Sequence, residues 1–140
     1  MGGDVRLFSG WGIESVDLDT STLEIQPGCY VLKAKGEIDL ESVGKFEESA
    51  EKVMKKAPKA VLVDLSGVSY MGSCGIRILL LLNTFMARSG NKLVIVGATG
   101  GVLATLELVG FPEMLHMAQN VEEGLKLLSA RRSRRRMRGA

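Results

Sequence analysis

A hydroxyl and a thiol stand next to each other between two glycines in the stretch MGSCG, residues 71–75, directly before the apolar run IRILLLL. Glycine has no Cβ, so Gly72 and Gly75 leave the Ser73 hydroxyl and the nearby amides open to an approaching group. Three kinds of chemistry suit such a hydroxyl: nucleophilic attack, a phosphate-binding loop, and acceptance of a phosphate from a partner protein. The structural alternative is that Ser73 caps the helix that follows it.

Nucleophilic catalysis is the least supported of the three. Hydrolases of the nucleophile-elbow type use the pattern G-x-S-x-G, and the residue two positions before Ser73 is Met71. The single histidine, His116, lies downstream, but a hydrolase of that fold needs a much longer chain. One histidine without a second ligand also supports no metal site. We therefore expect neither an enzyme nor a metal-binding protein.

A phosphate-binding loop is also weakly supported, at Ser73 or at the second glycine-rich stretch, GATGG at residues 97–101. Neither stretch carries the lysine of a P-loop or the spacing G-x-G-x-x-G, so no cofactor is predicted. A regulatory serine fits better. The amides and the dipole of a helix start would stabilise a phosphoserine by about 1–2 kcal/mol, while the added charge would repel a partner that packs apolar surface there.

The elements before Ser73 follow from periodicity. TLEIQ and YVLKAKG, separated by Pro27 and Gly28, predict an antiparallel strand pair. Apolar residues at spacings of three and four predict an amphipathic helix from Leu40 to Lys56. The apolar run AVLVDLS, residues 60–66, predicts a buried strand, which a seven-residue loop would join to a helix over about residues 74–88.

Strands and helices continue to alternate after that helix. NKLVIVG predicts a buried strand, GVLATLELVG a helix that ends at Gly110, and the residues around His116 a short edge strand. A last helix begins after Asn120, its expected N-cap. Helices between strands imply parallel crossovers, so the fold class is α/β with two or three layers.

Length and charge bound the organisation of the chain. Its 140 residues suit one domain. We expect this domain over residues 21–130, after a glycine-rich lead-in at residues 1–20. Six arginines fall in residues 131–140, which we expect to be a disordered tail. Without them, 12 basic residues face 16 acidic ones, a net charge of about −4 for residues 1–130. The folded part is therefore not expected to bind nucleic acid, whereas the tail suits an anionic surface.

Two cysteines, Cys29 and Cys74, form no CxxC pair, and reduced thiols in a cytoplasmic protein are the simplest interpretation. The N-terminus lacks the basic start and apolar core of a signal peptide. The apolar run at 76–82 is too short to span a bilayer. We expect no membrane span.

Three segments resemble a known family: VLVDLSGVSYMGSCGIRILL, GNKLVIVGATGGVLATLELVGF and GEIDLES. They are similar, in this order, to the STAS domain of bacterial anti-sigma factor antagonists, and the likeness runs from about residue 22 to residue 128. Its most specific part spans residues 64–76. The resemblance implies a four-stranded mixed sheet packed with about four helices.

The resemblance also implies a function. Unphosphorylated antagonists bind an anti-sigma factor that is also a serine kinase, and the kinase uses ATP to phosphorylate the antagonist and release it. Ser73 matches the phosphorylated serine, and Asp39 in GEIDLES matches an acidic residue beside it. The expected partner-binding residues are therefore Asp39, Gly72, Ser73, Cys74 and Gly75.

Two positions depart from the family pattern. Gly72 stands where the family usually has an acidic residue, and Cys74 where it has serine or threonine. These changes leave a second hypothesis open: a STAS scaffold subunit of a stressosome-like or membrane lipid-transport complex, in which Ser73 is structural. Oligomeric state does not follow from the sequence.

Overall fold

The computed structural model describes residues 18–129. Most of the predicted lead-in and the arginine-rich tail lie outside the described residues. The first strand begins at Leu18, whose side chain is buried in the core. The sheet therefore includes three residues that the sequence assigned to the lead-in.

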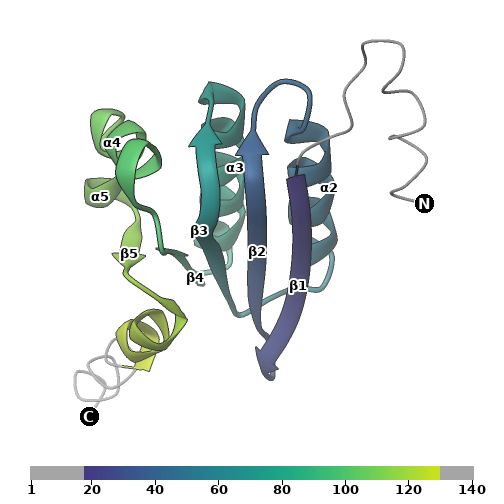
Figure 1. The fold of residues 1–140 in the computed structure, drawn as a ribbon. Helices are drawn as coiled ribbons and strands as arrows, with labels where there is room; N and C mark the ends of the chain where they lie inside the picture. Colours follow the sequence, from purple (N-terminus) through teal and green to yellow (C-terminus); the bar gives the residue numbers. More distant parts are fainter. Residues whose placement is uncertain (1–17, 130–140) are drawn as a thin grey trace.

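A five-stranded mixed sheet forms the centre of the molecule, with the strands in the order β1-β2-β3-β4-β5 (Figure 1). The strands are β1 (Leu18–Gln26), β2 (Cys29–Ile38), β3 (Ala60–Met71), β4 (Lys92–Val96) and β5 (His116–Ala118). β1 and β2 form an antiparallel hairpin, and each later neighbour is parallel. The predicted mixed sheet is confirmed, with the short edge strand at His116 as its fifth member.

Helices make each parallel crossover. They are α2 (Val43–Met54), α3 (Ser73–Arg88), α4 (Gly100–Leu108) and α5 (Phe111–Met114), and residues 121–129 are helical as well. Figure 1 shows α2 and α3 side by side behind the sheet. The amide of Glu123 donates to Asn120 Oδ1 over 2.8 Å, so the predicted cap of the last helix is confirmed.

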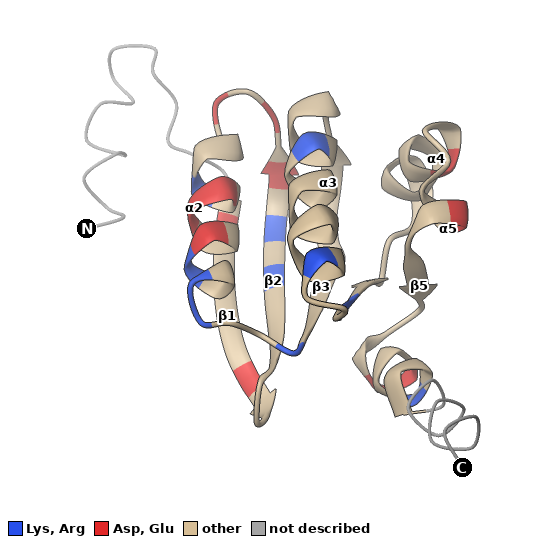
Figure 2. Cartoon of the chain, turned by 180° about the vertical axis from the view of Figure 1, so that it is seen from behind, with Lys and Arg blue, Asp and Glu red and all other residues tan. Residues whose placement is uncertain are grey.

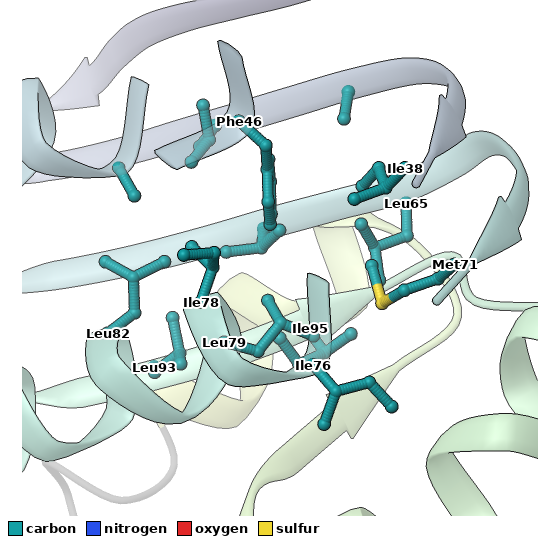
Figure 3. Packing of buried hydrophobic residues seen from close by; sticks show 14 of the residues in the cluster. Ile38, Phe46, Leu65, Met71, Ile76, Ile78, Leu79, Leu82, Leu93 and Ile95 are labelled. Atoms are coloured by element: carbon teal, nitrogen blue, oxygen red, sulfur yellow. The ribbon is translucent and has the colours of Figure 1, made fainter. Parts of the chain in front are cut away.

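Both faces of the central strands are buried because side chains of a strand alternate between faces. Val61, Val63 and Leu65 of β3 pack into the larger cluster, together with α2 and α3. Figure 3 shows this cluster around Phe46. Leu62 points to the other face and packs with Leu128 of the last helix. The domain is therefore three-layered around β3 and β4.

Two predicted boundaries were wrong. β3 does not end at Ser66 but runs to Met71, because β2 also continues and pairs with it through two register shifts that absorb the extra residues. Helix α2 begins at Val43, so Leu40 lies in the preceding loop instead of on the apolar helix face. The first correction shortens the connection before Ser73 to one residue, and the second places residues 39–42 in the loop before α2.

Gly124 sets how closely the last helix approaches the sheet. A Cβ at this position would lie 2.8 Å from Leu62 Cδ2 and 3.1 Å from Val96 Cγ1. These distances are too short for an ordinary carbon contact, so a larger side chain must push the helix away from the strands.

We expect Gly124→Val to lower the free energy of unfolding by about 1–3 kcal/mol, because it overpacks this contact. Lys126→Val introduces the same side chain at an exposed position of the same helix and should change stability by less than about 0.5 kcal/mol. Urea denaturation measures both. Equal losses for the two variants would contradict the tight contact.

Candidate functional site

The paired ends of β2 and β3 place the candidate site. Ile38 and Met71 form the last residue pair, and beyond it the amide of Gly72 donates to the Ile38 carbonyl over 2.9 Å. Asp39 directly follows Ile38, and Ser73 directly follows Gly72. Two residues that lie 34 positions apart in the sequence therefore become neighbours through strand register alone.

Ser73 is the first residue of α3, and the expectation that it is the N-cap was wrong. Gly72 occupies the N-cap position in an extended conformation, with φ −85° and ψ 176°, and makes no side-chain cap. Its carbonyl accepts hydrogen bonds from Gly75 N at 3.0 Å and Ile76 N at 3.3 Å. The amides of the first helical residues point out of the helix start, as at any α-helix N-terminus.

The Ser73 side chain is exposed, and its hydroxyl makes no hydrogen bond with any group of residues 18–129. The side-chain oxygen of an N-cap serine would instead accept a hydrogen bond from a backbone amide of its own helix. The hydroxyl is thus available to a reagent from solution.

Asp39 is held by a reciprocal set of bonds with Ser42. Its Oδ1 accepts from the amides of Glu41 and Ser42, each over 3.0 Å, and its own amide donates to Ser42 Oγ over 3.0 Å. The Ser42 hydroxyl donates to the Glu37 carbonyl over 2.6 Å. Asp39 therefore has the structural role of closing the turn before α2, while its Oδ2 makes no hydrogen bond within residues 18–129.

An open cleft of about 350 Å³ joins these groups. It is lined by Asp39, Leu40, Glu41, Tyr70, Gly72, Ser73 and Cys74. Figure 1 shows the loop from β2 to α2 and the start of α3 at the same end of the sheet. Four of the five predicted partner-binding residues thus line one cleft.

Gly75, the fifth, does not belong to that surface. It is buried, and an added Cβ would lie 2.7 Å from Ile38 Cγ2 and 2.9 Å from Met71 Cγ. The absence of a side chain lets α3 begin directly against the strand ends. Gly75 therefore positions the site instead of presenting itself to a partner.

Three lining residues were missed from the sequence: Leu40, Glu41 and Tyr70. Leu40 is 85% exposed and Tyr70 is 53% exposed, which is unusual for apolar and aromatic side chains beside each other in one cleft. Tyr70 could have been found by extending the β3 alternation outward from buried Met71. Leu40 was hidden because its spacing continues the pattern of α2.

The other sequence candidates lie elsewhere. His116 lines a different pocket with Asn83 and Ala87, ten or more residues along α3 from Ser73, or about 15 Å of helix. Ser73 and His116 therefore do not form a nucleophile–base pair. Asp64 Oδ1 accepts a hydrogen bond from the Ser66 amide over 2.9 Å, a structural role at the middle of β3.

The apolar residues around the end of α4 divide into two groups. Leu106 and Phe111 are buried in the core, whereas Leu108 is 87% exposed and Val109 is 45% exposed. Within residues 18–129, no cluster of histidine, cysteine or acidic side chains could hold a metal ion, and no helix could cross a membrane.

The geometry defines a class of protein: a small α/β domain that offers an exposed helix-start serine beside a carboxylate and apolar side chains, a surface suited to a protein partner. The family model described as the STAS domain matches residues 20–124, and the chain belongs to this family. The predicted fold class is confirmed by the solved structures.

Three similar proteins illustrate the relationship. An anti-sigma-B factor antagonist of Staphylococcus aureus is 24% identical over 108 residues, which cover 77% of this chain and 97% of the relative. An anti-sigma-F factor antagonist of Mycobacterium tuberculosis is 40% identical over 63 residues, 45% of this chain and 52% of the relative. The crystal structure of an anti-sigma factor antagonist from Mycobacterium paratuberculosis superimposes with a TM-score of 0.73 at 22% identity, covering 79% of this chain and 92% of the other.

Gly75→Ala should destabilise the domain by about 1–3 kcal/mol, since its methyl group would overlap Ile38 and Met71 at the base of the site. Gly44→Ala is the matched control near the start of α2, where an added Cβ meets no atom within 4 Å. It should stabilise the domain by about 0.5–1 kcal/mol. Thermal unfolding of both variants measures the difference, and a stabilised Gly75→Ala protein would contradict the packing described.

Proposed function

We propose that this protein is a cytoplasmic, non-enzymatic anti-sigma factor antagonist, switched by phosphorylation of Ser73. Its partner is an anti-sigma factor that is also a serine kinase, and ATP is the kinase's substrate. The observation that carries this proposal is the exposed Ser73 hydroxyl at the start of α3, in one cleft with Asp39. Membership of the STAS family and the named relatives support it.

The covalent step is a phosphoryl transfer within the complex. A bond forms between Ser73 Oγ and the γ-phosphorus of ATP, while the bond from that phosphorus to the β,γ-bridging oxygen breaks and ADP leaves. The hydroxyl proton passes to a base of the kinase or to water. This chain supplies the acceptor oxygen and its position, and Asp39 supplies a negative charge at the edge of the cleft.

The phosphate would change the cleft from a mixed surface to a strongly anionic one. It adds a charge of about −1.5 to −2 next to Asp39 and Glu41, and it lies beside exposed Leu40 and Tyr70. An interface that buries these apolar side chains must then desolvate the phosphate as well. A cost of about 3 kcal/mol lowers affinity more than a hundredfold.

The backbone at Gly72 would accept the acidic residue that usually stands here in the family. Its extended conformation suits any residue, and an added Cβ would meet Tyr70 Oη at 3.5 Å, an ordinary contact. Gly72→Asp should therefore fold normally and raise the rate of phosphorylation, because it restores a carboxylate beside the hydroxyl. Phosphoryl-transfer reactions with the kinase, quenched at set times, measure this rate.

Phosphorylation at Ser73 is tested by incubating the protein with the anti-sigma factor kinases of its organism and ATP. One phosphate should appear by mass, and Ser73→Ala should take up none. Calorimetry should show that the unphosphorylated protein binds the kinase and that the phosphorylated protein binds it more than about a hundredfold more weakly. Label at another residue, or equal affinity of both forms, would contradict the switch and favour the scaffold function.

Two substitutions of Asp39 separate the effect of its charge on kinase binding from the effect of its hydrogen bonds on the turn before α2. Asp39→Asn keeps an oxygen that accepts the amides of Glu41 and Ser42, whereas Asp39→Ala loses both bonds and should cost about 1 kcal/mol of stability. Both variants should weaken kinase binding about thirtyfold if the carboxylate meets a cation of the partner. Normal binding by Asp39→Asn would show that only the turn matters.

A further inference from the structure

Arg77 lies one helical turn beyond Ser73 on the exposed surface of α3. Residues at positions i and i+4 of a helix have their Cβ atoms about 5–6 Å apart, within reach of a long side chain. Arg77 makes no ion pair with a carboxylate of residues 18–129. A guanidinium that no acidic group of the domain engages therefore lies next to the candidate phosphorylation site.

Helix geometry directs this side chain toward Ser73. Each Cα–Cβ bond tilts toward the helix N-terminus, so a helical residue covers the turn that precedes it. The neighbour at i+3 from Ser73 is Ile76, which is buried in the core and does not compete for the surface. The order also matters, because an anion N-terminal to a cation at this spacing is the favourable arrangement with respect to the helix dipole.

The other charges around Ser73 are negative. Asp39 and Glu41 approach from the loop between β2 and α2, and no basic residue of the described part of the chain lines the cleft. Figure 2 shows acidic residues in that loop and basic bands on α3. A phosphate on Ser73 would have carboxylates on one side and the Arg77 guanidinium on the helix surface, so its oxygens are drawn along α3.

We propose that Arg77 is a positioning residue that binds the phosphate of phosphorylated Ser73 in an i,i+4 pair. The inference rests on the proposed function, since it requires that Ser73 carry a phosphate. A guanidinium presents parallel N–H donors that match two phosphate oxygens. The pair offsets the repulsion from Asp39 and Glu41 and favours the dianion, so it lowers the second pKa of the phosphate.

The test is a phosphorus NMR titration of the full chain with phosphoserine installed at position 73 during translation. In Arg77→Gln the second pKa of the phosphate should rise by about 0.3–0.7 units relative to the wild type, because a nearby cation that favours the dianion is lost. Arg77→Lys keeps the charge without the planar fork and should fall between them. The difference should shrink at 1 M salt.

Arg88→Gln is the matched control, an arginine removed from the last turn of the same helix. It lies about 22 Å of helix rise from Ser73, beyond the screening length at physiological salt, and should leave the phosphate pKa unchanged. An unchanged pKa in Arg77→Gln, or an equal shift in Arg88→Gln, overturns the proposal. The unphosphorylated Arg77→Gln protein should keep the wild-type melting temperature, which separates phosphate binding from a structural role.

The two proposals fail in different ways. Because the phosphoserine is installed without a kinase, the titration gives a result even if no kinase modifies Ser73. A lack of phosphate transfer would contradict the proposed function, whereas a normal transfer with an unchanged phosphate pKa in Arg77→Gln would contradict only the role of Arg77.

Discussion

The hydrogen bond from the Gly72 amide to the Ile38 carbonyl is the constraint on which the site depends. It continues the β2–β3 pairing past the last side-chain pair and leaves no free loop between strand and helix. Backbone pairing alone then fixes the positions of Asp39 and Ser73, independently of side-chain contacts. The core supports this arrangement from below, because Ile38 and Met71 are buried under the start of α3.

Close packing at two glycines holds the three layers in place. Gly75 admits α3 to the strand ends, and Gly124 admits the last helix to the opposite face of β3 and β4. In both places the neighbouring atoms lie at distances that no larger side chain would allow. The sheet is therefore clamped between helices on its two sides, and the cleft sits on a part of the fold with few alternatives in backbone position.

Periodicity predicted the elements better than their ends. The three-and-four spacing around Phe46 identifies a helix with one buried face, and the continuous apolar run at Val61–Val63 identifies a strand buried on both faces. The end of β3 was missed because Ser66, Gly67 and Ser69 resemble a loop in composition, yet they lie in a bulged strand whose partner continues beside them. Pairing between distant segments does not appear in a local pattern.

The site was predicted in part for the same reason. Ser73 was found from the glycine-flanked stretch before a predicted helix, and Asp39 was found through the family resemblance. The exposed side chains of Leu40 and Tyr70 depend on where α2 begins and which way β3 turns its residues. The cap role assigned to Ser73 was wrong because Gly72 supplies the extended residue that ends the strand. That one-residue step distinguishes a serine engaged by its own helix from one that faces solvent.

The single residue between β3 and α3 has a further consequence for signalling. A one-residue connection leaves little room for a hinge, so a phosphate added at Ser73 under the proposed function would act mainly through its charge. Exchange of side chains around the rim of the cleft would then change which partner binds there, while the backbone of the scaffold stays the same.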